Sequence, residues 1–304
     1  MTDIPTVVAH VTHLERGADA IRLADQFATR ARGGRLYVTH VVPAMPDAMR
    51  DILFPYACFG ADEVDIEAEL IQHAGKRAVQ TLKGTYGPDL RDALRVGYGP
   101  HNDTADAMLA ELGPDVVVAH RPDDLRLGLL SREADALVRR ARVPVVLARE
   151  VSSDAAEIRS IAVAYDLTLE SRTLLETAIR WASRMGAQVT PIAVASSPTV
   201  GDHAGLWGEA KPLSKRSRGS MEKLDLQWRS TMELEFPQKR ELEERLNDTV
   251  LLAGDAVDAV LEAASEADLL VVGRARPGRP AGSFGRVASA LASRAPMHVA
   301  VVPL

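Results

Sequence analysis

The sequence predicts an α/β protein built from two tandem domains, each a doubly wound, five-stranded parallel sheet. The first observation is an internal repeat, because the two halves of the 304 residues match each other at an offset of about 154 residues. The second is that short apolar runs alternate with segments of helical periodicity in both halves. The apolar runs are continuous, which is typical of parallel strands that are buried on both faces.

The first half contains all the elements of one such domain. Its five apolar runs predict strands, in the order TVVAHVT, RLYVTHVVP, ALRVGYGP, PDVVVAH and VPVVLA. The segment 18–34 predicts a helix, because Ile21, Ala24, Phe27 and Ala28 recur at helical spacing. Further helices are expected in ADAMLAEL and ADALVRRA, before the fourth and fifth strands.

The second half repeats this order. Its strands are expected in SIAVAYDLT, QVTPIAVAS, TVLLAGDA, ADLLVVG and HVAVV. The helix at 171–187 has Leu175, Ala178 and Ala182 on its apolar face, and Gly186 follows where a left-handed cap belongs. We therefore expect domains at 1–150 and 157–304, joined by the polar linker at 149–160. Right-handed crossovers then give each half a parallel sheet.

Long crossovers follow the second strand of both halves, at about 43–91 and 196–247. The second of them carries a basic run, Lys211, Lys215, Arg216 and Arg218. A run of this kind is usually a solvated loop. The alternatives are a flap that closes over an anionic ligand, or a segment regulated by modification of its serines.

Composition excludes several classes of protein. The net charge is −6, which disfavours a general nucleic-acid binder, and the single cysteine, Cys58, cannot form an internal disulfide. The N-terminus lacks the features of a signal peptide, and no run of 18 apolar residues is present. We expect a cytoplasmic protein that contacts neither membranes nor nucleic acid.

A ligand is expected beyond the carboxyl ends of the strands, where strand order reverses in open α/β sheets. In the second half, Asp166 ends the first strand, and a loop rich in Gly and Arg at 273–286 follows the fourth strand. Backbone N–H groups at the start of the next helix can bind an anion, and glycine lets the backbone approach it closely.

On these residues, both halves resemble the universal stress protein domain, and the whole chain is similar to its tandem form, with a Rossmann-like fold. Members of that family that bind ATP carry an Asp at the end of the first strand. They also carry G-x2-G-x9-G-[ST] between the fourth strand and the last helix. The resemblance implies a stress-response sensor or regulator that binds an adenine nucleotide.

The second half keeps part of this motif. Gly273 matches the first glycine, Arg276 replaces the second, and Gly285-Arg286 falls one residue early at the G-[ST] position. Arg274, Arg276, Arg279 and Arg286 are expected to surround the loop with positive charge, which suits phosphate. The resemblance implies the following candidate residues for ATP in the second domain: Ala164, Asp166, Val194, Gly273, Arg276, Gly278, Gly282, Gly285 and Arg286.

The first half departs further from the motif. Val11 is read at the Asp position, His120 at the first glycine and Asp123 at the second, while Ser131-Arg132 replaces G-[ST]. The negative charge of Asp123 would repel a phosphate. We expect no ATP in this half.

Histidines gather in the first half near predicted strand ends, and His10 and His120 are expected to approach each other. The five that lie near these ends are His10, His13, His40, His101 and His120. They could form a metal site or a pH-sensitive anion site. The alternative, which the absence of a ligand motif favours, is a set of buried or exposed histidines without a metal.

Three functions remain. The first is a tandem regulator that binds an adenine nucleotide only in its second domain. The second is a nucleotide-independent scaffold that acts through dimerisation and partner binding. The third is an enzyme of the wider adenine-nucleotide α-hydrolase group, which the lack of a catalytic constellation disfavours.

The resemblance further implies that the halves pair as a pseudo-dimer through VPVVLA and HVAVV. A homodimer and an unknown protein partner are also expected.

Overall fold

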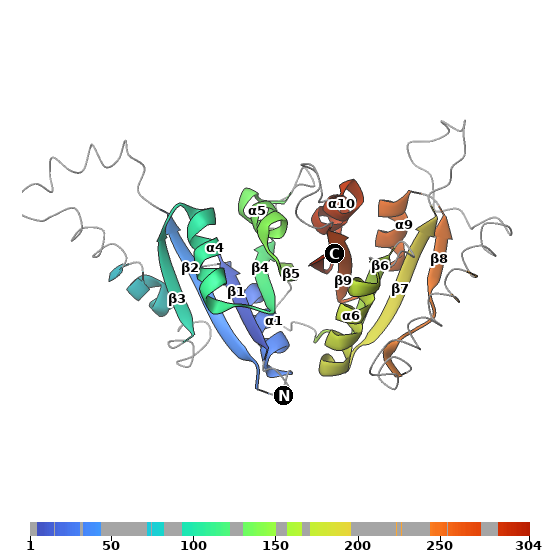
Figure 1. Ribbon diagram of the computed structural model, residues 1–304, viewed down its shortest axis with the longest axis horizontal. Helices are drawn as coiled ribbons and strands as arrows, with labels where there is room; N and C mark the ends of the chain where they lie inside the picture. The colour runs from blue at the N-terminus through green and yellow to red at the C-terminus, as the bar shows by residue number, and fades with distance from the viewer. Residues whose placement is uncertain are drawn as a thin grey trace, which may run out of the picture. The chain divides into compact units, whose positions relative to one another are not determined.

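The fold alternates strands and helices along the chain, as Figure 1 shows for the computed structural model. The structure describes residues 5–14, 16–30, 33–43, 72–73, 75–81, 93–121, 130–149, 157–165, 171–195, 223, 226, 244–253, 255–274 and 285–304. The α/β class and the tandem organisation predicted from the sequence are confirmed.

The described elements follow the order that each half of the sequence predicts. The strands are β1 (Thr6–Val11), β2 (Arg35–Pro43), β3 (Leu94–Gly99), β4 (Val116–Arg121), β5 (Val145–Arg149), β6 (Ser160–Tyr165), β7 (Gln188–Ala195), β8 (Val250–Ala253), β9 (Leu269–Arg274) and β10 (His298–Pro303). The helices are α1 (Ala18–Thr29), α4 (His101–Leu112), α5 (Arg132–Arg140), α6 (Arg172–Met185), α9 (Ala256–Ala263) and α10 (Arg286–Arg294).

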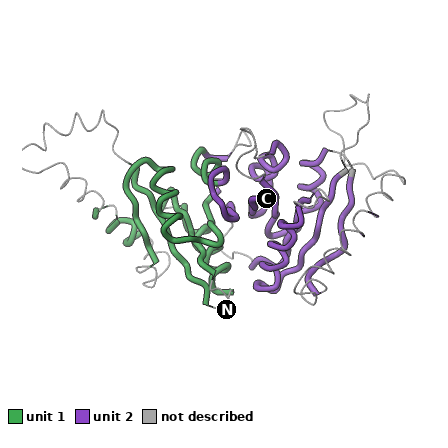
Figure 2. Tube along the Cα trace, viewed as in Figure 1, with its two compact units in different colours: residues 1–120, 132–137 green, residues 121–131, 138–304 purple. Residues whose placement is uncertain are grey.

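The chain divides into two compact units, which Figure 2 shows in green and purple. Unit 1 comprises residues 1–120 and 132–137, and unit 2 comprises residues 121–131 and 138–304. In unit 1, β1 lies between β2 and β4, and β3 pairs with β2, all in parallel. Helix α1 packs on β1 and β2, and α4 packs on β2 and β3.

Unit 2 has the same core arrangement. Strand β6 lies between β7 and β9, with β8 beyond β7 and β10 beyond β9, all in parallel. By its contacts, β5 also belongs to this unit, where it pairs antiparallel with β10 in a register that places Val146 opposite Ala300. The continuous apolar runs are buried along nearly their whole length, as in β9 and β10.

A carboxylate ties the first strand to the fourth in each unit. The backbone N–H of Thr6 donates to Asp115 at 2.7 Å, and that of Ser160 donates to Asp268 at 2.9 Å. The strand registers agree, because Val7 lies opposite Val116 as Ile161 lies opposite Leu269. These matched registers establish which residues of the two repeats are equivalent.

Helix ends and core residues follow the sequence pattern. Gly186 ends α6 in the left-handed region, with φ of 76°, and its N–H bonds to the carbonyl of Ala182. Trp181, on the apolar side of α6, is buried as expected. Among the helices that the structure describes, none combines the length and the apolar character that crossing a membrane requires.

Candidate functional site

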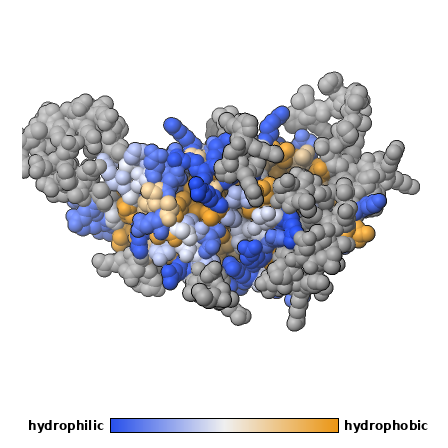
Figure 3. Space-filling view, in the orientation of Figure 1, coloured by the Kyte–Doolittle hydropathy of each residue, from blue (hydrophilic) through white to orange (hydrophobic). Residues whose placement is uncertain are grey.

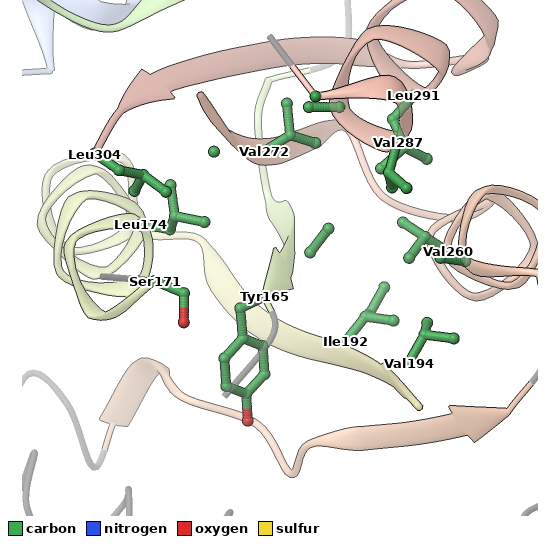
Figure 4. Close-up of a pocket in the computed structure, with 15 residues that line it drawn as sticks. Tyr165, Ser171, Leu174, Ile192, Val194, Val260, Val272, Val287, Leu291 and Leu304 are labelled. Carbon is green, nitrogen blue, oxygen red and sulfur yellow. The ribbon is translucent and has the colours of Figure 1, made fainter. Parts of the chain in front are cut away.

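A cavity of about 390 Å³ lies in unit 2 beyond the carboxyl ends of β6 and β9 (Figure 4). From β6 the chain continues to β7 on one side, whereas β9 lies on the other, so strand order reverses here. The cavity thus occupies the position where open α/β sheets bind ligands. Its lining residues are Ala164, Tyr165, Ser171, Leu174, Ile192, Val194, Ala256, Val260, Val272, Gly273, Gly285, Val287, Ala288, Leu291 and Leu304.

The lining is almost entirely apolar. Among its described residues, only Tyr165 and Ser171 carry a polar side-chain atom, and none carries a charge. Figure 4 shows the aliphatic side chains facing one another from opposite sides, with these two hydroxyls at one edge. Such a surface suits a flat, uncharged ring better than an anion, and the volume falls in the range of small-molecule sites.

The N-terminus of α10 forms one side of this cavity through Gly285, Val287 and Ala288. Gly285 is its N-cap, and no described side chain caps the first turn. Unbonded N–H groups at a helix start carry partial positive charge and attract anions. At α9, by contrast, the Asp255 carboxylate already accepts hydrogen bonds from the first amides. The α10 start is therefore the better place for a phosphate.

Gly273 brings the backbone of β9 close to the side chains around it. A Cβ atom at this position would lie 2.8 Å from Cδ1 of Leu304 and 3.2 Å from Cδ1 of Leu174. Both contacts are shorter than carbon atoms tolerate comfortably, so packing alone favours glycine here. A ligand group placed directly on Gly273 would require Leu304 to shift.

The structure brings part of the predicted site together. Ala164, Val194, Gly273 and Gly285 all line the cavity, and Arg286, which is exposed, is the first residue of α10. The remaining candidates lie outside the described residues: Asp166, Arg276, Gly278 and Gly282. Sequence reasoning missed the apolar wall, of which Tyr165, Ile192 and Val260 are part. The helical and strand periodicity pointed to burial there, but not to a cavity.

Arg274 does not act as predicted. It was expected among the cations around the loop, but it is only 2% exposed and lies away from the cavity. Its guanidinium donates hydrogen bonds to the carbonyl oxygens of Arg139 and Ala141, at the C-terminal end of α5. The prediction is wrong because the carbonyl groups at the C-terminal end of a helix carry partial negative charge, so they attract a guanidinium group as a phosphate would.

The equivalent arginine of the first repeat makes the matching contact. Arg121 ends β4 as Arg274 ends β9, and its guanidinium donates to the carbonyls of Ala292 at 3.0 Å and Ala295 at 2.7 Å. These carbonyls belong to the last turn and C-cap of α10. Both arginines therefore serve as C-terminal helix caps within unit 2.

In unit 1, histidines occupy three of the positions that line the cavity of unit 2. The strand registers make His10 equivalent to Ala164, Thr39 to Ile192, His101 to Ala256 and His120 to Gly273. The ring of His10 lies edge-on to that of His101, with centroids 5.3 Å apart, and its Nδ1 is 3.0 Å from Thr39 Oγ1. Imidazole rings therefore fill this space in unit 1.

Two of these histidines, His10 and His40, favour the neutral state. Burial, followed by the nearby His101 and His40, lowers the pKa of His10 to about 3. Burial also lowers the pKa of His40, against the hydrogen bond from its Nδ1 to the carbonyl of Val11 at 2.8 Å. Within the described residues, no three His, Cys, Asp or Glu side chains are placed to hold a metal.

The first-half motif needs one correction. Because β1 and β6 share a register in which Thr6 matches Ser160, Val11 is equivalent to Tyr165. Thr12, not Val11, therefore stands at the Asp166 position. Asp123 lies outside the described residues, while Ser131 precedes α5 as Gly285 precedes α10.

Comparisons with known proteins agree with this architecture. The model of the universal stress protein family matches residues 5–149 and again residues 157–303. Universal stress protein G of Salmonella typhimurium (strain LT2) is 30% identical over 141 residues, which are 46% of this chain and 93% of that protein. The crystal structure of a universal stress protein from Archaeoglobus fulgidus is similar in fold, with a TM-score of 0.62 and 14% identity, covering 99% of this chain and 97% of that one. The chain therefore belongs to the universal stress protein family and carries two copies of its domain.

Proposed function

We propose that this protein is a stress-response regulator that binds one adenine nucleotide per chain, in the cavity of unit 2. The observation that carries the proposal is the position of this cavity, at the strand-order reversal between β6 and β9 and beside the uncapped start of α10. Unit 1 is proposed to bind no nucleotide in this manner, because His10, His101 and His120 occupy the equivalent positions.

In this proposal the base occupies the apolar part of the cavity. Ile192, Val194 and Val260 would contact its faces, and the hydroxyls of Tyr165 and Ser171 could bond to its edge or to the ribose. Removing apolar surface of the base and the cavity from water contributes about 25 cal/mol per Å² to the free energy of binding. The phosphates would lie at the start of α10, where backbone amides attract negative charge.

Binding, rather than catalysis, is proposed as the activity. No nucleophile, base and orienting group meet among the described residues that line the cavity. We propose that nucleotide occupancy controls the affinity for a protein partner in the cytoplasm, and that the protein forms a homodimer. A nucleotide-independent scaffold is the alternative that the following experiment separates.

The decisive test compares two charge substitutions on α10. Val287 lines the cavity and is 45% exposed, so Val287→Glu should leave the fold intact while placing a negative charge beside the proposed phosphate site. At about 6 Å and an effective dielectric constant of about 20, one such pair costs about 3 kcal/mol before screening. Calorimetric titration with ATP should therefore show at least about tenfold weaker binding.

Ser289→Glu is the matched control, because it adds the same charge to the same helix without lining the cavity. Ser289 is half-buried and does not line the cavity, so we expect the added charge to change the ATP dissociation constant by less than about threefold. Asp166→Ala tests the residue that the family resemblance implies. Wild-type protein that shows no heat of binding and no thermal stabilisation at millimolar ATP would exclude the nucleotide proposal and leave the scaffold.

A further inference from the structure

A second, chemically different pocket lies in unit 1. It has a volume of about 520 Å³ and is formed by the segment after β1, by β2 and by the helical residues 75–81. Its lining residues are Thr12, His13, Leu14, Arg16, His40, Arg77 and Thr81. We call this the basic pocket. It lies beyond the end of β1 and beside β2, in the unit that does not hold the cavity proposed for the nucleotide.

The basic pocket concentrates positive charge in a chain whose net charge is −6. Arg16 and Arg77 each contribute a guanidinium group, and neither makes an ion pair within the described part of the chain. No acidic side chain is among the described lining residues, and Glu15 lies outside them. Two exposed cations that face one hollow without a counterion repel each other, and an anion between them removes this cost.

The remaining polar groups suit a tetrahedral oxyanion. Thr12 has a hydroxyl that can donate a hydrogen bond, and His13 and His40 contribute imidazole rings. His40 is held in place because its Nδ1–H donates to the carbonyl of Val11 at 2.8 Å, which leaves Nε2 for other partners. Guanidinium groups bind phosphate oxygens in pairs, and hydroxyls complete the remaining bonds.

The charge of this pocket is specific to the first repeat. By the register of β1 and β6, Thr12 corresponds to Asp166, and Arg16 corresponds to Glu170. The second repeat thus has acidic residues at two positions where the first has a hydroxyl and a cation. The basic pocket is therefore not a copy of the nucleotide site but a separate feature of unit 1.

We propose that the basic pocket binds a phosphate dianion, either free or as the phosphomonoester group of a small metabolite. The volume lies within the range of small-molecule sites, so an organic substituent has room. The inference does not depend on the nucleotide site of unit 2, since the two pockets share no lining residue.

The test titrates the full-length protein with inorganic phosphate and with ribose 5-phosphate in chloride buffer at constant ionic strength. Binding is followed by calorimetry and by the NMR signals of the histidine ring protons. The signals of His13 and His40 should shift in a saturable way. Tighter binding of ribose 5-phosphate assigns the pocket to a phosphomonoester, and tighter binding of inorganic phosphate assigns it to the free ion.

Arg77→Gln and Lys76→Gln form the matched pair, because the two neighbours are both exposed but only Arg77 lines the pocket. Arg77→Gln should raise the dissociation constant about tenfold or more, and Lys76→Gln less than about twofold. Val287→Glu, which addresses unit 2, should leave the phosphate-induced shifts of His13 and His40 unchanged. Equal effects of Arg77→Gln and Lys76→Gln, loss of binding in Val287→Glu, or the absence of saturable shifts at His13 and His40 would each overturn the proposal.

Discussion

Replacement of Arg274 by methionine should destabilise the protein without weakening nucleotide binding. The arginine side chain is 2% exposed, and its guanidinium donates to the carbonyls of Arg139 and Ala141 at the end of α5. Methionine can retain part of the packing of the aliphatic stem but has no hydrogen to donate. The substitution therefore removes two charge-assisted hydrogen bonds, and the two carbonyl oxygens can then be hydrogen-bonded only by water.

The expected loss follows from these two bonds. A hydrogen bond to a charged group contributes about 1.5–3 kcal/mol, so two give about 3–6 kcal/mol. The end of α5 is partly accessible, since Arg139 is exposed and Ala141 is half-buried. Water can therefore replace part of the loss, and we expect the free energy of unfolding to fall by about 3 kcal/mol. The midpoint of thermal unfolding should fall by about 6–12 °C.

Urea unfolding followed by circular dichroism measures the stability, and calorimetry with ATP measures the affinity. Arg286→Met is the control, because Arg286 is an exposed arginine at the start of α10 and its loss should change stability by less than about 0.5 kcal/mol. If Arg274→Met loses less than about 1 kcal/mol of stability, or if it weakens ATP binding at unchanged stability, the assignment of Arg274 as a helix cap is wrong.

Three further substitutions or conditions test the fold. Burial, followed by the charge of Arg121, lowers the pKa of His298 to about 4. The unfolded chain therefore binds more protons than the folded chain between pH 6.5 and 4, so the free energy of unfolding is highest above about pH 6.5 and falls by about 2.5 kcal/mol at pH 4.5. Urea unfolding of His298→Gln should show a smaller loss over the same pH range. Asp268→Ala removes the acceptor for the N–H of Ser160 and should cost about 2 kcal/mol in the same assay. Gly186→Ala places a Cβ at φ of 76° and should cost about 1–2 kcal/mol, visible as a lower melting temperature.

The order of strands and helices could be predicted from the sequence because each element carries its own periodicity. Continuous apolar strands such as β4 and β9 are buried on both faces, as their composition requires. The partner of β5 could not be derived from periodicity. An apolar strand at a sheet edge needs a neighbour, but its residues do not specify which one. The antiparallel pairing with β10 is a property of tertiary contacts.

Prediction of the site was limited in a different way. Gly273 was predicted from the family motif and from the close approach that glycine allows to a phosphate, whereas the structure shows a different constraint, because a Cβ there would crowd the side chains of Leu304 and Leu174. Arg274 was not assigned correctly, because a guanidinium suits a helix C-terminus and a phosphate equally well, and only its position relative to α5 decides between them. The residues that line the apolar cavity have the same composition as an ordinary core.

Beyond the carboxyl ends of their strands, the two repeats differ in side-chain volume and charge, whereas their strand registers are the same. In unit 1, imidazole rings stand where unit 2 has Ala164, Ala256 and Gly273, and burial lowers the pKa of one of them, His10, to about 3. Two cationic groups of unit 1, Arg16 and Arg77, line the basic pocket beyond the end of β1. Figure 3 shows apolar surface reaching solvent in the region of α9 and α10, where Val287 remains 45% exposed. On these two proposals, a duplicated fold offers an apolar site in one copy and a basic, anion-binding site in the other, because the chemistry of a ligand site depends on a few positions that the core does not constrain.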